Sequence, residues 1–336
     1  MFAVTAATMM ETLGLKTALK RGALLALANW PLVAVQFVAE STFKIVLAVP
    51  VVGGMLLVTL LAGEAIEPFG PADLRERVAA IAGTLLDAPA ALAAFVAAFG
   101  IVLIGGSALL FLIKGGTMTV MAESETTAGP IERPPLRWEA IVWAGRYNID
   151  GFVAGCRHLF RRYFRLGLIL IGVYAVSGTV YLAVMFVGFP ASTHPGILVG
   201  WTVFAALASG ALVVWITLVN LMYLLAQMIV AVEDVGVRQA ARRVAEFLRG
   251  AFREVAGVFG VVLVLVLLAT VVSILATAGL GLISFVPFAG LVVLPLQLTA
   301  WLVRGIIFQY LGLTALGAYL TEYRAYSNRG AKLRIA

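Results

Sequence analysis

Apolar residues gather in six long runs separated by polar or basic stretches. The runs cover 31–63, 88–113, 166–189, 197–232, 257–282 and 289–320. A helix needs about 20 apolar residues to cross a hydrocarbon core about 30 Å thick, and a segment in lipid must satisfy its own backbone groups. The pattern therefore predicts an all-α, polytopic membrane protein with six transmembrane helices. Several runs are longer than a crossing requires, so we expect those helices to tilt, kink or extend beyond the bilayer.

Two stretches between the runs carry apolar and basic residues on opposite sides of a helix. One is 151–165 and the other is 237–255, where apolar residues recur every three to four positions. This spacing is typical of basic amphipathic helices that lie in the membrane interface. Basic side chains there attract anionic lipid headgroups. The residues expected to do so are Arg161, Arg162, Arg165, Arg238, Arg242, Arg249 and Arg253.

The basic segments suggest an internal repeat. Each odd-numbered run follows a basic segment and begins near an aromatic residue, which is Trp30, Phe164 or Phe252. Read this way, the chain consists of three units, each an interfacial helix followed by a membrane hairpin. Basic flanks before a span are also common in unrelated membrane proteins, so a coincidental pattern is the alternative.

The whole chain, 1–336, is expected to form one transmembrane domain. Only 12% of its residues are charged and 62% are hydrophobic, whereas a soluble domain is roughly a quarter charged. The stretch 115–137 contains three prolines and is the one linker-like segment. It is too short to form a separate domain.

The basic residues predict an orientation. Most of the 24 lysines and arginines lie in the N-terminal segment, in the loops after the second and fourth runs, and in the C-terminal tail. Only Arg75 and Arg77 lie in the opposite loops. The positive-inside rule then places both termini in the cytoplasm and the protein in the cytoplasmic membrane. The net charge of +7 is explained by anionic headgroups, so no nucleic-acid partner is expected. A protein partner is left open.

Polar residues inside the runs are the candidate functional residues. An ionisable side chain at the centre of a span costs about 2.5 to 3.5 kcal/mol and normally faces protein or water. One interpretation is that these side chains line a polar cavity. The other is that they bridge helices, with Glu40 paired to Lys44 or to Arg304, directly or through a neighbour. The candidates are Gln36, Glu40, Lys44, Asn220, Gln227, Gln297 and Arg304, with Gln309 further along the last run.

Few residues of the chain suit catalysis or metal binding. The only histidines are His158 and His194, and Cys156 is the only cysteine. Cys156 and His158 are two residues apart, which directs them to different sides of a helix. His194 has no neighbouring acid or second ligand in its loop. We therefore expect no catalytic site, no metal site and no cofactor.

Two segments carry a family resemblance. Segment 233–252 reads EDVGV, followed by Ala240, Arg242, Arg243, Phe247, Arg249, Gly250 and Phe252. It resembles the segment before the fifth span in the membrane domain of some glycerophosphodiester phosphodiesterases and in its stand-alone six-span relatives. Segment 318–324, AYLTEYR, is similar to the closing motif of that family. The resemblance implies the six-span layout but no phosphodiesterase activity, because the catalytic barrel of those enzymes is a separate soluble domain.

Three functions remain open at this point. The first is a non-enzymatic role in organising or sensing the membrane, or in serving a partner complex, through the basic interfacial helices. The alternative is a transporter or permease subunit whose pathway contains the polar residues of the spans. A lipid-modifying enzyme is the third and is disfavoured by the scarcity of histidine and cysteine.

Overall fold

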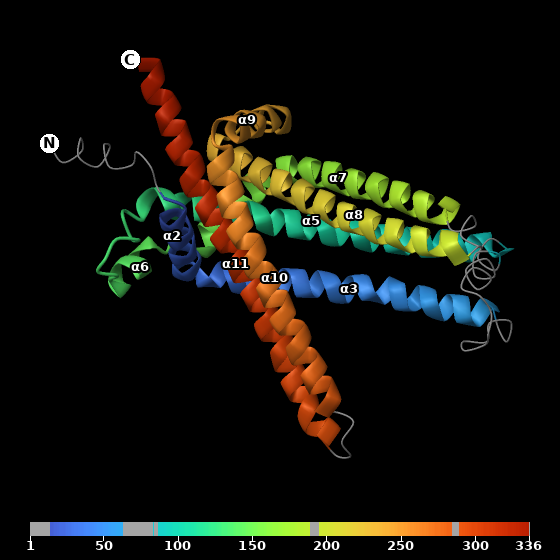
Figure 1. The fold of residues 1–336 in the computed structure, drawn as a ribbon. Coiled ribbons are helices and arrows are strands. Elements are labelled where there is room, and N and C mark those ends of the chain that lie inside the picture. The colour runs from blue at the N-terminus through green and yellow to red at the C-terminus, as the bar shows by residue number, and fades with distance from the viewer. Residues whose placement is uncertain (1–13, 63–82, 84–86, 189–194, 284–288, 336) are drawn as a thin grey trace.

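The computed structural model describes residues 14–62, 83, 87–188, 195–283 and 289–335 (Figure 1). These residues form helices and connecting turns, with no strand among them. The helices are α2 (Leu15–Ala28), α3 (Trp30–Ala62), α5 (Pro89–Thr127), α6 (Trp138–Ala144), α7 (Ile149–Gly188), α8 (Pro195–Glu233), α9 (Val237–Gly250), α10 (Phe252–Ile283) and α11 (Ala289–Ile335).

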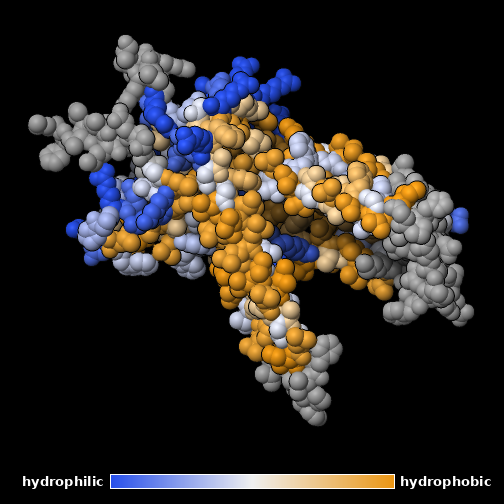
Figure 2. All heavy atoms as spheres, viewed as in Figure 1, coloured by the Kyte–Doolittle hydropathy of each residue, from blue (hydrophilic) through white to orange (hydrophobic). Residues whose placement is uncertain are grey.

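Six of these helices are long and apolar enough to cross a membrane. The spans are Trp30–Gly54, Pro89–Thr127, Ile149–Phe186, Val199–Glu233, Phe252–Ile283 and Val293–Arg329. The prediction of an all-α, polytopic protein with six transmembrane helices is therefore confirmed. Their apolar side chains face outward over much of the surface (Figure 2), as lipid-facing helices require.

The six long helices form two groups that meet at one end (Figure 1). Helices α3, α5, α7 and α8 form a group with their axes roughly aligned and their chain directions alternating. Within it, α5 packs against α7 and α3. The α10–α11 hairpin diverges from them. Helix α2 packs along α11 at the shared end, and α9 packs against the last turns of α8. The arrangement is therefore a wedge that is closed at the end carrying α2 and α9.

The packed core lies at this closed end. Its largest fully buried side chains include Leu25 of α2, Tyr163 of α7, Met228 of α8, Phe247 of α9 and Tyr319 of α11. The far halves of the long helices expose most of their apolar side chains. Packing between helices thus holds the chain together at one end, and lipid would cover the rest.

The linker predicted for 115–137 is wrong over residues 115–127, which continue helix α5. The glycines there serve packing instead of a turn. A Cβ atom on Gly116 would lie 2.6 Å from the carbonyl oxygen of Phe152 and 2.7 Å from the sulfur of Cys156. Small residues allow two helices to approach this closely in a membrane protein. Helix α5 consequently reaches well past the predicted end of its span.

The basic segments adopt two arrangements. Helix α9 is separate from its span, because the chain leaves the helix at Ala251 before α10 begins. Helix α2 is likewise separated from α3 at Asn29. The basic stretch 151–165, in contrast, forms the first turns of α7 and continues into the span without a break. The three-unit layout is thus present with one variation.

Candidate functional site

A cavity of about 360 Å³ lies where the two groups of helices meet. Side chains of α3, α5, α8, α10 and α11 line it. Apolar residues such as Leu221, Phe259 and Leu316 form much of its wall. The polar side chains that line it include Gln36, Glu40, Lys114, Asn220, Gln227 and Gln309. All of these except Lys114 were candidates from the sequence, and the fold brings them together from α3, α8 and α11.

Gln227 and Thr117 are the most deeply buried polar residues of this cavity. The side chain of Gln227 is 1% exposed, and its amide nitrogen has no hydrogen-bond partner among the described residues. The backbone oxygen of Gln227 accepts a hydrogen bond of 2.7 Å from the Tyr163 hydroxyl, which fixes α8 against α7. A buried donor without a partner is rare in folded proteins. Gln227 therefore presents an unused N–H group to the cavity.

Lys114 of α5 is the cation of this cavity. Its ammonium nitrogen lies 5.3 Å from the ring centroid of Tyr223 on α8. No carboxylate of the described residues lies within ion-pair distance of it. The sequence predicts Lys114 in the basic loop after the second span, because the apolar run ends one residue before it. The continuation of α5 is what turns it into an intramembrane residue.

Asn220 lies one to two turns from Gln227 along α8. Its side-chain oxygen accepts a hydrogen bond of 2.5 Å from the hydroxyl of Tyr174 on α7. This contact leaves the amide nitrogen of Asn220 without a recorded protein partner in the described part of the chain. Asn220 thus joins α7 to α8 and also contributes to the lining of the cavity.

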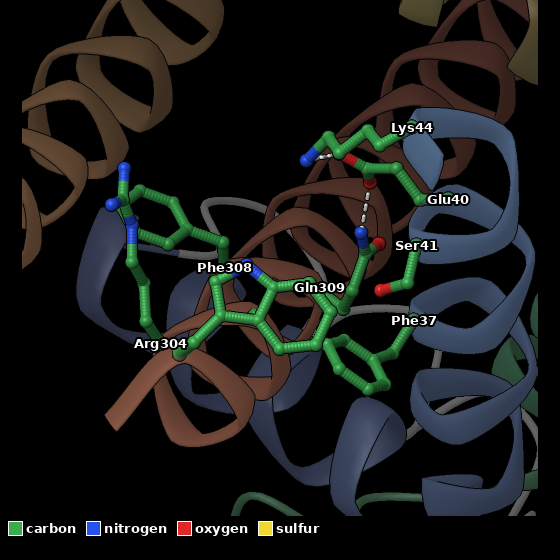
Figure 3. A pocket seen from close by; sticks show the side chains of 9 residues that line it. Phe37, Glu40, Ser41, Lys44, Arg304, Phe308 and Gln309 are labelled. Atoms are coloured by element: carbon green, nitrogen blue, oxygen red, sulfur yellow. Dashed lines mark hydrogen bonds and ion pairs between the residues drawn. The ribbon is translucent and has the colours of Figure 1, made fainter. Parts of the chain in front are cut away.

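Glu40 and Gln309 connect this cavity to a second one, of about 370 Å³ (Figure 3). One carboxylate oxygen of Glu40 lies 2.6 Å from the ammonium nitrogen of Lys44, one turn along α3. The other accepts a hydrogen bond from the side-chain amide of Gln309 on α11. Of the two partners expected for Glu40, the structure shows Lys44.

Arg304 lines the second cavity on the side away from Glu40 (Figure 3). Its guanidinium carbon lies 5.7 Å from the ring centroid of Phe308, and no ion pair with Glu40 forms. Arg304 also borders a third cavity, of about 590 Å³, between α10 and α11. Gln297 lines this third cavity too, two turns before Arg304.

The three cavities adjoin one another around α11: the second lies between α3 and α11, and the third covers the same length of α11 on the side of α10. The first and second share Glu40 and Gln309, and the second and third share Arg304 and two aromatic neighbours. At about 1.5 Å per residue, α11 extends about 33 Å from Gln297 to Tyr319, the two ends of this series. That length is close to the hydrocarbon thickness of a bilayer, about 30 Å.

The arginines predicted to contact headgroups lie mainly on the outer surface of the closed end. Arg162 is partly covered and pairs with Asp234. The exposed ones are Arg161, Arg165, Arg238, Arg242, Arg249 and Arg253. The apolar side of α9 packs on protein, with the ring of Phe247 centred 5.1 Å from that of Tyr323. The arginines of α9 consequently point away from the core.

The turn between α8 and α9 is fixed by a charged cluster. Asp234 lies at φ 53°, a conformation that Asp tolerates better than most residues. One of its carboxylate oxygens lies 2.8 Å from the Nε2 atom of His158 and also accepts a hydrogen bond from Arg162. These hydrogen bonds from α7 hold the pKa of Asp234 below its ordinary value.

Comparisons with models of protein families, with curated proteins and with solved structures find no match to this chain. What the site can do follows from its own side chains. An ammonium group, several amides and a carboxylate line adjoining cavities, and apolar helix surfaces flank them. Such surroundings suit a molecule with a polar end and an apolar end.

Proposed function

We propose that this protein moves amphiphilic molecules across a membrane by passing their polar headgroups along the three cavities of α11. The observation that carries the proposal is that the three cavities adjoin one another, with Glu40 and Gln309 bordering the first and second and Arg304 bordering the second and third. Polar residues in a span are costly. Polar residues in adjoining cavities give a headgroup successive hydrogen-bond partners in place of water.

The walls of the cavities support an amphiphile over a fully polar solute. The third cavity is lined by apolar residues of α10, among them Leu265, Leu268 and Val272, and its polar residues are few. Gln297 and Arg304 lie on α11, opposite those apolar residues. A headgroup could follow α11 while its acyl chains stay against the apolar surface. This is the transporter alternative of the sequence interpretation, with the substrate narrowed to an amphiphile.

Reconstitution into liposomes tests the proposal. Vesicles of phosphatidylcholine and phosphatidylglycerol carry a trace of fluorescent phospholipid, and dithionite bleaches only the lipid of the outer leaflet. Wild-type protein should raise the bleached fraction above one half. Replacing both Gln297 and Gln309 by Leu should slow this by at least about tenfold, the equivalent of about 1.4 kcal/mol in the barrier.

The matched control is Gln239→Leu. Gln239 lies on the exposed surface of α9 and outside all three cavities. This variant should behave as wild type. If wild-type vesicles bleach only the outer half, or if the double variant equals the wild type, the proposed function is rejected.

The closed end of the wedge faces the cytoplasm in this proposal, with the protein in the cytoplasmic membrane. The exposed arginines of α7, α9 and α10 lie at that end, which agrees with the positive-inside rule. A periplasmically active reporter fused to the C-terminus should then be silent. An active reporter would reverse the orientation.

A second candidate is a membrane-organising role that depends on the same arginines. Arg238, Arg242 and Arg249 are exposed on α9, and each basic residue near an anionic surface contributes about 1 kcal/mol of attraction. Arg242→Glu with Arg249→Glu should reduce the phosphatidylglycerol that co-purifies with the full chain. Unchanged lipid content would remove this candidate.

The family resemblance also becomes a structural proposal. Its two segments touch each other, because the hydroxyl of Tyr323 donates a hydrogen bond to Glu233 and the ring of Phe247 packs on Tyr323. We propose that this contact between the α8–α9 junction and the end of α11 is common to the six-span membrane domains. A solved structure of such a domain that lacks it would refute the relationship.

A further inference from the structure

We infer that the cavity between Lys114 and Gln227 is a binding site for a phosphate group, of the kind carried by phospholipid headgroups. The inference rests on the proposed function and names the chemistry of its substrate. Two independent features of the cavity support it, one on α5 and one on α8. Each is a donor that the protein itself leaves without a suitable acceptor.

The first feature is the amide of Gln227. It is 1% exposed and lines the cavity, and its nitrogen forms no well-aligned hydrogen bond with the described residues; the hydroxyl of Tyr223, which likewise has none, lies beside it. Buried polar groups in folded proteins nearly always have a partner from protein, water or ligand. An acceptor inside the cavity would complete this one.

The second feature is the ammonium group of Lys114. In the described part of the chain, its recorded interactions are with the ring of Tyr223, centred 5.3 Å away, and, beyond ion-pair distance, with the charge of Glu40. Glu40 lines the same cavity, but its two oxygens are taken by Lys44 and Gln309. A charge in such surroundings is normally paired. The cavity therefore has room for an anion, and no carboxylate of the described residues pairs directly with Lys114.

The arrangement of donors favours a phosphate over a smaller anion. Lys114 on α5 offers three N–H donors, and Gln227 and Asn220 add amide donors from α8. Gln36 lies on α3, at another wall of the same cavity. Donors that arrive from three helices suit an anion with several oxygens pointing in different directions. A phosphodiester in a lipid and free phosphate share this chemistry.

The source of the phosphate is expected to be a lipid. The cavity belongs to a series that continues along the lipid-facing surface of α11, and much of its own lining is apolar, including Leu224 and Val262. An acyl chain can accompany a headgroup in such a place. Free phosphate would have to leave water to reach it.

Binding to the full-length protein tests the site. The protein is purified in detergent and titrated with phosphatidylglycerol, and bound lipid is counted by native mass spectrometry. Detergent without lipid is the blank, and inorganic phosphate is titrated in a separate series. Lys114→Gln should weaken phosphatidylglycerol binding by at least about tenfold. Gln227→Leu removes the second donor and should weaken it independently.

Lys16→Gln is the matched control. It removes the same charge from the exposed surface of α2, outside the cavities, and should leave binding unchanged. Saturable binding of inorganic phosphate that Lys114→Gln abolishes would also support the site and would assign it to the free anion. Equal binding by wild type and Lys114→Gln would overturn the inference, and if that variant does not fold, Gln227→Leu decides in the same way.

The outcomes separate this site from the proposed function. Lipid binding that depends on Lys114, without transbilayer movement in vesicles, would keep the site and reject transport. Transbilayer movement that persists in Lys114→Gln, together with unchanged lipid binding, would keep transport and reject the site.

Discussion

Gly22 of α2 and Gly317 of α11 meet backbone to backbone. A Cβ atom on Gly317 would lie 2.8 Å from the Cα atom of Gly22, and one on Gly22 would lie 2.3 Å from the carbonyl oxygen of Thr314. Both distances are shorter than any ordinary contact of a Cβ atom. Helices approach this closely only through small residues. The contact fastens the amphipathic helix α2 to the hairpin that carries the cavities.

Gly22→Ala should therefore destabilise the protein by about 1 to 3 kcal/mol, the usual cost of overpacking. The added methyl group meets backbone atoms, which cannot move aside as a side chain can. Thermal unfolding in detergent measures the effect. Gly260→Ala is the control, because its Cβ would meet nothing within 4 Å and alanine favours helix by up to about 1 kcal/mol. Equal unfolding temperatures for the two variants would contradict the close contact.

Asn29 joins four segments at the break between α2 and α3. Its amide nitrogen donates to the backbone oxygen of Leu25 and the hydroxyl of Ser124, each at 3.0 Å. Its oxygen accepts from the backbone nitrogens of Arg146 at 2.9 Å and Tyr147 at 3.1 Å. The side chain is fully buried and fully satisfied.

We expect Asn29→Ala to be among the most destabilising single changes outside the apolar core. Each buried group left without a partner costs about 1 to 3 kcal/mol. Asn148→Ala is the comparison, since Asn148 makes one exposed cap-like bond to the backbone of Gly151, whose loss costs about 1 kcal/mol. Chemical denaturation would show whether the first change is the larger. A smaller effect at Asn29 would mean that water replaces its bonds.

Glu125 of α5 is a buried acid held between two arginines. Its carboxylate lies 3.5 Å from the Nε atom of Arg21 and 2.7 Å from that of Arg324, and its side chain is 5% exposed. Removing one partner of a buried ion pair costs about 3 to 5 kcal/mol. Glu125→Gln should lower stability by that order, because Arg324 loses its acid and Arg21 keeps only Glu132.

The exposed pair of Arg243 and Glu246 provides the contrast for Glu125. Their nitrogen and oxygen lie 3.1 Å apart on the surface of α9, and exposed pairs contribute about 0 to 1 kcal/mol. Glu246→Gln should be nearly silent in the same unfolding assay. If Glu125→Gln were equally silent, the cluster would not hold α2, α5 and α11 together.

Asp234 should make stability depend on acidity. His158 and Arg162 lower its pKa in the folded protein, so the carboxylate stabilises the fold fully above its ordinary value of 3.8. The contribution is lost as the pH falls through the lowered pKa. Asp234→Asn keeps a residue that tolerates positive φ and removes the charge.

The test compares the unfolding temperatures of wild type and Asp234→Asn between pH 7 and pH 3. Wild type should be the more stable at neutral pH, and the difference should shrink toward the acid end. A difference that stays constant over this range would show that Asp234 contributes through hydrogen bonding alone.

The fold could be predicted because lipid imposes strong constraints on a spanning chain. The apolar runs identify the six spans, and the cost of polar groups singles out Gln36, Glu40, Asn220 and Gln227. These signals are local in the sequence. They require no knowledge of how the helices pack.

The site could be predicted only in part, because it depends on packing between distant helices. The apolar run ends just before Lys114, so the sequence predicts a loop there. In the structure helix α5 continues through Gly116, which packs against α7. The partner of Glu40 on α11 is Gln309, and Arg304, five residues earlier on that helix, points to the far side of the cavity. Neither the continuation of α5 past Lys114 nor the contact of Glu40 with Gln309 can be read from residue spacing in the sequence.

The central claim is that the polar side chains of α11 border a hydrated path across the membrane, and thiol accessibility tests it most directly. Single cysteines at Gln297 and Gln309, in a Cys156→Ala background, are compared with cysteines at Leu298 and Ile306, which lie on the exposed apolar surface of the same helix. Only the hydrated thiolate reacts with a charged methanethiosulfonate reagent. Proteoliposomes should show reaction at 297 and 309 and none at 298 and 306 in the same time. Equal protection at all four positions would contradict a polar path along α11.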